Sequence, residues 1–309
     1  MGSTLLMVLC VVSSTTVNGK FLFNTFLEKL REGEVTREGG GAHWTYSGET
    51  GPSNWGHFSP ICASGHQQSP INILHDHIVN HKAQQSSKKV GVAALKGFTW
   101  IGYDVMPSAS FVVNNGHTAQ VGITQDPMPV VFGGGLDGHY IFAQLHFHWG
   151  SDSSKGSEHL IDGGAAPLEM HLVHYKKAYG TIDEALKHFD GLAVFSVMFQ
   201  VGETPFPAVA DLVSNFGAIT NPGGDKAPLA TIHPIKDYLP ADTRSFFRYH
   251  GSLTTPPCSE AAVWTVFADR PTVTEDHLAQ FRGLKDSEGN ALVNNFRPTQ
   301  DMYGRTVSV

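Results

Sequence analysis

Two histidines lie two positions apart in the apolar and aromatic run Gln-Leu-His-Phe-His-Trp, residues 144–149. Side chains at positions i and i+2 of a β-strand point to the same face. His146 and His148 are therefore expected to project side by side, with Gln144 on the same face. A strand of this kind is either the wall of a site or an element with two structural histidines.

A second run, Glu-Met-His-Leu-Val-His at residues 169–174, has the same character. On a strand, Glu169, His171 and Val173 share one face. If the two strands are neighbours, His171 meets both histidines of the first run. Three neutral imidazoles and one open position form the coordination sphere of a catalytic zinc ion. Ordinary core or surface histidines are the alternative, but three at strand spacing favour the metal site.

Other polar groups suit a zinc site. Ligating imidazoles are usually held by a hydrogen bond from their second ring nitrogen. Gln144 and Glu169 are in phase to accept it from His146 and His171. Three further stretches carry useful chemistry: the hydroxyl-bearing loop 252–257, the carboxylate in 156–159 and the histidine in 114–117.

Short apolar segments alternate with turn signals through most of the 309 residues. Strands are expected at 98–101, 111–113, 130–132, 141–149, 170–175 and 192–201. Short helices are expected at 181–189, which opens with a capping-box pattern, and at 275–281. The pattern predicts one α+β, mainly β domain, with a large, mostly antiparallel sheet and small peripheral helices. The net charge of −7 has no basic block, which argues against nucleic-acid binding.

The first 19 residues resemble a secretory signal peptide. Residues 5–12 form an apolar core too short to span a bilayer, and small residues at 17–19 suit cleavage after Gly19. No Lys or Arg precedes the core, so a buried N-terminal strand is the alternative. No later stretch has transmembrane length and no hydrophobic tail follows, so we expect a secreted protein without a membrane anchor.

Residues 20–42 form a separate N-terminal extension. Apolar residues recur at helical spacing from 20 to 37, and three glycines at 39–41 follow. We expect a short amphipathic helix and a joint before the main domain, 43–309. A pro-segment, a docking helix, a contact to extracellular matrix or mineral, and a plain packing helix all remain open.

The cysteines agree with export. Cys10 lies in the expected signal peptide, which leaves Cys62 and Cys258 as an even pair. In an oxidising compartment such a pair is expected to form a disulfide. Two free buried thiols are the alternative.

Several ordered motifs resemble those of α-class carbonic anhydrases, of the secreted type, from His43 to about Arg305. These are both histidine runs, 68–73 (Gln-Ser-Pro-Ile-Asn-Ile), 156–159 and 251–257. The resemblance implies a large twisted sheet with Zn²⁺ at the base of a conical cleft. It also implies reversible hydration of carbon dioxide to bicarbonate and a proton, and inhibition by sulfonamides.

The resemblance assigns roles residue by residue. His146 and His148 would bind zinc through Nε2, and His171 through Nδ1. Thr254 would accept a hydrogen bond from the zinc-bound hydroxide that attacks carbon dioxide, and Glu158 would accept the proton of Thr254. His117 would be the proton shuttle, with a pKa near neutrality.

The resemblance also implies a substrate pocket and an ordered solvent network. The pocket positions are Val173, Val194, Leu253, Thr254, Thr255, Ala262 and Trp264. The network positions are Tyr46, Asn115 and Gln120. Ala262 and Gln120 depart from the valine and asparagine that are common in the family.

Two other functions are compatible with this fold. One is a catalytically silent secreted matrix or binding protein, but silent relatives typically lack a zinc histidine and this chain has all three. The other is a zinc hydroxide esterase, although nothing in the chain resembles a dedicated ester-binding site.

Overall fold

The computed structural model describes residues 43–309 except 75, 77, 80–96 and 225. The expected signal peptide, 1–19, and N-terminal extension, 20–42, lie outside the described residues. No helix among the described residues is long and apolar enough to cross a membrane.

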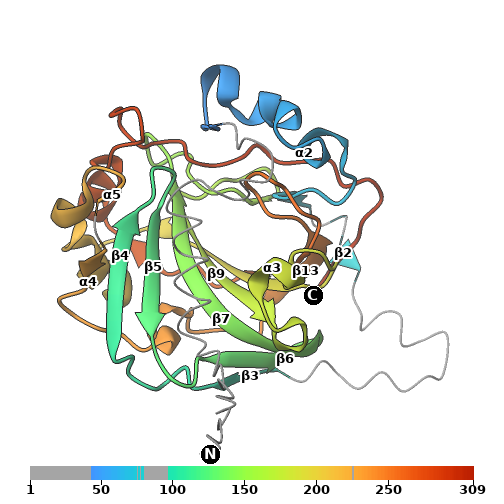
Figure 1. The fold of residues 1–309 in the computed structure, drawn as a ribbon, viewed down its shortest axis with the longest axis horizontal. Coiled ribbons are helices and arrows are strands. Elements are labelled where there is room, and N and C mark those ends of the chain that lie inside the picture. The colour runs from blue at the N-terminus through green and yellow to red at the C-terminus, as the bar shows by residue number, and fades with distance from the viewer. Residues whose placement is uncertain (1–42, 75, 77, 80–96, 225) are drawn as a thin grey trace, which may run out of the picture.

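A 12-stranded mixed sheet dominates the fold (Figure 1). In order across the sheet, the strands are β12 (Ala227–Pro228), β4 (Ala109–Asn114), β5 (Ala119–Thr124), β7 (Leu136–Trp149), β9 (Leu168–Lys176), β10 (Leu192–Met198), β14 (Ala262–Phe267), β13 (Phe246–Gly251), β16 (Val307–Ser308) and β2 (Ile78–Val79). β6 (Val130–Gly133) pairs with β7 and with β3 (Phe98–Ile101). The pairs β10–β14 and β16–β2 are parallel, and the other pairs of this sheet are antiparallel.

Small elements surround the sheet. Two parallel pairs join β1 (Asn72–Ile73) to β8 (Leu160–Ile161) and β11 (Gln200–Val201) to β15 (Thr272–Val273). The α-helices are α2 (Ile61–Ser64), α3 (Ile182–Ala185), α4 (Pro207–Val213) and α5 (Glu275–Arg282). The 3₁₀ helices are η1 (Gly48–Thr50), η2 (Pro52–His57), η5 (Lys177–Tyr179), η6 (Phe216–Ile219) and η7 (Ile235–Tyr238).

The predicted fold class is confirmed, and each predicted strand is present. The segment 192–201 differs in detail, because β10 ends at Met198 and β11 pairs elsewhere with β15. The helix expected over 181–189 is α-helical only over Ile182–Ala185, although Thr181 caps it by accepting from the backbone N–H of Glu184. β5, β13 and β14 were not predicted.

β7 and β9 are neighbours at the centre of the sheet. Their antiparallel register places His146 opposite His171 and His148 opposite Glu169. The other face of β7 is buried, with Phe147 and Trp149 against the ring of Phe281 in α5. The alternation of β7 therefore turns polar side chains toward the site and anchors the strand through its aromatic ones.

The predicted disulfide between Cys62 and Cys258 is present. It joins α2 to the loop that follows β13, and both cysteines pack with buried Trp55. That loop also carries Thr254. The disulfide therefore ties one wall of the site to a helix 196 residues away in sequence.

Replacing both cysteines with serine is expected to lower the free energy of unfolding by about 2–5 kcal/mol, because the open chain gains loop entropy. Urea unfolding of the oxidised protein and of the double variant measures the difference. Equal urea midpoints for the two proteins would contradict this prediction.

Candidate active site

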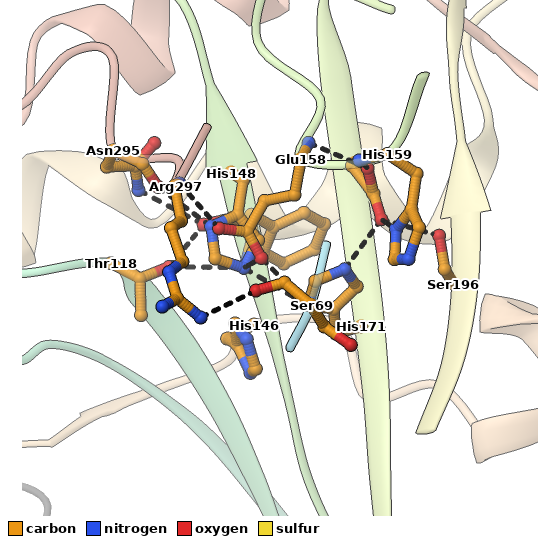
Figure 2. Close-up of polar contacts among 12 residues, drawn as sticks. Ser69, Thr118, His146, His148, Glu158, His159, His171, Ser196, Asn295 and Arg297 are labelled. Carbon is orange, nitrogen blue, oxygen red and sulfur yellow. Dashed lines mark hydrogen bonds and ion pairs between the residues drawn. The ribbon is translucent and has the colours of Figure 1, made fainter. Parts of the chain in front are cut away.

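The three predicted zinc ligands converge on one point (Figure 2). His146 and His148 come from β7 and His171 from β9, and their ligand atoms all lie within 4.8 Å of one another. His148 Nε2 and His171 Nδ1 are 3.1 Å apart. His148 and His171 are buried, whereas His146 is half-buried, so the cluster opens to solvent on the side of His146.

The second nitrogen of each ring is hydrogen-bonded to an oxygen that can only accept. The pairs are His146 Nδ1 with Gln144 Oε1 at 3.0 Å, His148 Nδ1 with Asn295 O at 2.8 Å, and His171 Nε2 with Glu169 Oε1 at 2.7 Å. Each of these nitrogens therefore carries a proton. The lone pairs that remain are on Nε2, Nε2 and Nδ1, the atoms that face one another.

This donor set fits zinc. Burial lowers the pKa of His148 to about 4 and also lowers the pKa of His146 and His171, so all three rings are neutral near pH 7. Three nitrogen lone pairs directed at one point repel one another unless a cation lies between them. Three neutral imidazoles with an open position are the ligand set of catalytic zinc.

Glu169 is the most heavily hydrogen-bonded side chain near the cluster. Its Oε1 accepts from His171 and from Ser196 Oγ, both at 2.7 Å, and from His159 Nδ1 at 2.6 Å. Its Oε2 accepts the backbone N–H groups of Glu158 and His159. Burial raises the pKa of Glu169, but the imidazoles of His159 and His171 outweigh burial and hold it well below its usual range. An ionised Glu169 orients His171.

Glu158 points one oxygen at the same cluster. Its Oε1 accepts the backbone N–H of Arg297 at 2.8 Å. Its Oε2 lies 3.5 Å from His148 Nε2 and has no hydrogen-bond partner among the described residues. Burial raises the pKa of Glu158 to about 7, while His171, the Arg297 N–H and the Thr254 hydroxyl oppose the increase. The Thr254 hydroxyl thus lies near this carboxyl, although Oε2 has no hydrogen-bond partner among the described residues.

An apolar wall adjoins the histidines. Val173, Val194, Ala262 and Trp264 belong to one buried cluster, and Leu253 packs against it. The rings of Trp264 and His171 are 4.8 Å apart. Thr255 is half-buried in the loop after β13. Val173, Val194 and Trp264 thus lie in one row across β9, β10 and β14, beside His171.

His117 lies in the turn between β4 and β5. Its ring stacks on Trp44, with centroids 3.8 Å apart and planes 9° apart. Burial, and then the nearby imidazole of His43, lower the pKa of His117 to about 4, and Asp286 opposes them. In this stacked position the ring does not titrate near neutrality. A cavity of about 290 Å³ adjoins it, with His43, Tyr46 and Asp286 among its lining residues.

The expected solvent-network residues are only partly together. Tyr46 has its ring 6.4 Å from that of His117. Asn115 uses its side-chain oxygen to accept the N–H groups of His117 and Thr118, which holds the turn. Gln120 pairs with His146 across β5 and β7.

Several site residues were missed from sequence. Asn295 supplies the acceptor for His148, and its side chain also holds β7 by donating to Phe147 O and accepting from the Trp149 N–H. His159 and Ser196 donate to Glu169. Asn295 lies 147 residues from His148, so no local spacing could reveal this contact.

Comparison with known proteins places the chain in a family. The eukaryotic-type carbonic anhydrase family matches residues 50–309. Carbonic anhydrase 7 of Homo sapiens is 39% identical over 270 residues, which cover 85% of this chain and 96% of the relative. A putative carbonic anhydrase 3 of Caenorhabditis elegans is 35% identical over 268 residues, covering 86% and 96%. Carbonic anhydrase 6 of Homo sapiens is 34% identical over 269 residues, covering 85% and 82%.

The fold and the three-histidine site are those of a zinc lyase. The chain belongs to the eukaryotic-type carbonic anhydrases. It catalyses the zinc-dependent, reversible hydration of carbon dioxide to bicarbonate, and its ligands include the sulfonamide inhibitors of this family.

Proposed function

We propose that this carbonic anhydrase is secreted, that Thr254 and Glu158 orient its nucleophile, and that His117 carries the product proton to solvent. The observation that carries the role of Thr254 and Glu158 is the buried Glu158 Oε2, directed at the ligand nitrogens of His148 and His171. A carboxylate in this place, next to the Thr254 hydroxyl, suits control of hydrogen bonding at the open zinc position.

His146, His148 and His171 hold the metal, with Gln144, Asn295 and Glu169 as their hydrogen-bonding partners. When bound, zinc supplies a Lewis acid that makes hydroxide available from water near neutral pH. Because all three ligands are neutral, they leave the charge of the ion undiminished.

Thr254 and Glu158 act as a pair. The Arg297 N–H occupies Glu158 Oε1, which leaves Oε2 to accept the hydroxyl proton of Thr254. A threonine that donates to a carboxylate presents only lone pairs on its other side. Thr254 therefore accepts a hydrogen bond from the nucleophile and disfavours ligands that have no proton to donate.

The apolar wall holds the substrate. Carbon dioxide has no net dipole, so the apolar side chains of Val173, Val194 and Trp264 offer it a favourable surface that does not bind water in its place. Leu253 and Ala262 complete the wall.

His117→Ala is expected to lower kcat by about tenfold or more at low buffer concentration and to leave kcat/KM unchanged. A group that transfers a proton contributes roughly 10²–10⁴-fold to a rate, and the remaining buffer makes up part of that loss. The ring must leave Trp44 to accept a proton near pH 7, since its pKa in the stacked position is about 4. Stopped-flow hydration with and without added imidazole measures the effect. The exposed His139→Ala serves as control, and a variant rate that matches wild type without imidazole would contradict the role.

Secretion is supported by the disulfide, because such bonds persist mainly in oxidising compartments. On this proposal residues 1–19 are removed as a signal peptide, 20–42 form an extension that contacts extracellular matrix or mineral, and 43–309 form the catalytic domain.

One experiment tests the secreted enzyme as a whole. The full chain is expressed in cultured eukaryotic cells, and the protein in the medium is sequenced from its N-terminus, analysed for zinc and assayed by stopped flow with a sulfonamide control. The expected result is an N-terminus at Lys20, one zinc per chain and sulfonamide-sensitive hydration. Retention of the uncleaved chain inside cells would overturn secretion, and stoichiometric zinc without hydration would overturn the assigned roles.

A further inference from the structure

The pairing of β5 with β7 ends just before the metal ligand His148. The last residues that these strands pair are Gln120 and His146, and β5 begins at Ala119. Phe147 lies between the two ligands of β7, one residue beyond this pair. At Phe147, side chains rather than a strand bind the backbone of β7 on this side.

Thr118 binds both backbone groups of Phe147. Its hydroxyl donates to Phe147 O at 2.5 Å and accepts the Phe147 N–H at 3.1 Å. The hydroxyl has one proton, and the other carbonyl near it, Ala119 O, is farther away at 3.3 Å. Thr118 is buried, so water does not compete for these contacts. One side chain thus takes the place of a strand partner.

Asn295 binds the same stretch of backbone and is also buried. Its Nδ2 donates to Phe147 O at 3.2 Å and to His117 O at 3.0 Å, and its Oδ1 accepts the Trp149 N–H at 2.7 Å. Its backbone oxygen accepts from His148 Nδ1. The amide therefore fixes the oxygen that orients His148 against the strand that carries His148.

We propose that Thr118 is a positioning residue for zinc binding. Together with the Asn295 amide, its hydroxyl clamps the β7 backbone at Phe147, and Figure 2 shows Thr118 and Asn295 on one side of His148. Because Phe147 lies between His146 and His148, the clamp fixes the spacing and direction of these ligands. The inference goes beyond the proposed function and does not depend on the roles proposed for the nucleophile-orienting pair or the proton shuttle.

The clamp matters because a zinc site needs its ligands at fixed positions. Loss of the Thr118 hydroxyl leaves the buried Phe147 N–H without its acceptor, and a buried N–H without a partner is unfavourable. The strand relieves this cost by shifting toward another acceptor. A shift of β7 at this residue moves the ligand side chains on both sides of it.

Thr118→Val tests the clamp, because it replaces the hydroxyl with a methyl group of similar size. Thr118→Ser keeps the hydroxyl and is the conservative variant. Thr272→Val, in the separate β11–β15 pair, is the matched control, since the Thr272 hydroxyl also donates to a backbone carbonyl. The readouts are zinc dissociation into an excess of chelator, the NMR shift of the Phe147 amide proton in the zinc protein, and thermal unfolding.

Zinc should dissociate about three- to tenfold faster from Thr118→Val, at or below the low end of the roughly 10–100-fold cost of losing a direct partner of a ligand. The Phe147 amide proton should move upfield in this variant, because its hydrogen bond is lost. Thr118→Ser and Thr272→Val should match wild type in both readouts. Both Thr→Val variants should unfold at a lower temperature, so the control separates lost stability from lost zinc.

Zinc dissociation from Thr118→Val at the wild-type rate would overturn the proposal. Equal acceleration in Thr118→Ser would show that the methyl group acts rather than the hydroxyl. Equal acceleration in Thr272→Val would show that lower stability alone releases zinc. Either of these two results would also overturn the clamp.

Asn295→Ala gives a test that does not use Thr118→Val. It keeps the backbone oxygen for His148 and removes the second half of the clamp, so zinc should again dissociate at least about threefold faster. In the double variant, the acceleration should differ by more than about twofold from the product of the single effects, because both side chains bind Phe147. Agreement with the product, or wild-type zinc dissociation from Asn295→Ala, would overturn the shared clamp.

Discussion

His171→Ala is expected to yield a folded protein without stoichiometric zinc and with carbon dioxide hydration reduced by at least about 10³-fold, since zinc enzymes owe most of their large rate enhancements to the metal. The physical reason is that two imidazoles remain where three converge. Metal analysis after dialysis and stopped-flow hydration measure the two effects, and circular dichroism checks the fold.

His174→Ala is the matched control for this substitution. His174 belongs to the same strand, but it faces the opposite side of the sheet, where its ring contacts Phe142 and Phe195. The His174→Ala variant should be less stable than wild type and should keep its zinc. Retention of one zinc per chain by folded His171→Ala would contradict the assignment of the ligands.

Thr254→Ala is expected to keep zinc and to lower kcat/KM for hydration by about 10²-fold, the size of effect that loss of reactant positioning produces. On the proposed mechanism, the variant leaves Glu158 Oε2 without the Thr254 proton and leaves the nucleophile without the group that orients it. Stopped-flow hydration on metal-analysed protein gives the comparison.

Thr254→Ser separates the hydroxyl from the methyl group of this residue. It keeps the proton for Glu158, so its kcat/KM should stay within a few-fold of wild type, and zinc content should be the same in all three proteins. Unchanged turnover by zinc-loaded Thr254→Ala would remove Thr254 from the proposed mechanism.

The central strands could be predicted because their signals are local. In β7 and β9, side chains alternate between a polar face and an apolar face, so the phase of His146, His148 and His171 is readable from spacing alone. β5 was not predicted because five of its six residues are buried, so its sequence shows no alternation of apolar and polar residues.

Contacts between distant segments could not be read in this way. Asn295 reaches His148, and Tyr249 reaches His159 across 90 residues, through the packing of separate loops and strands. The pKa of His117 is a similar case, because its decrease to about 4 comes from burial against Trp44 and from neighbouring His43. None of these environments exists until the chain is folded.

By itself, the sequence determined that three imidazoles share a face at strand spacing, that an amide and a carboxylate accompany them, and that two cysteines are available to pair. These are properties of the period of a strand and of residue chemistry, so they need no tertiary information. Spacing leaves open which nitrogen of each ring faces the site. The family resemblance implied it, and only the tertiary structure shows the reason, because an oxygen from Gln144, Asn295 or Glu169 binds the other nitrogen. Local spacing therefore indicates the metal ligands, and long-range hydrogen bonds orient the rings of these ligands.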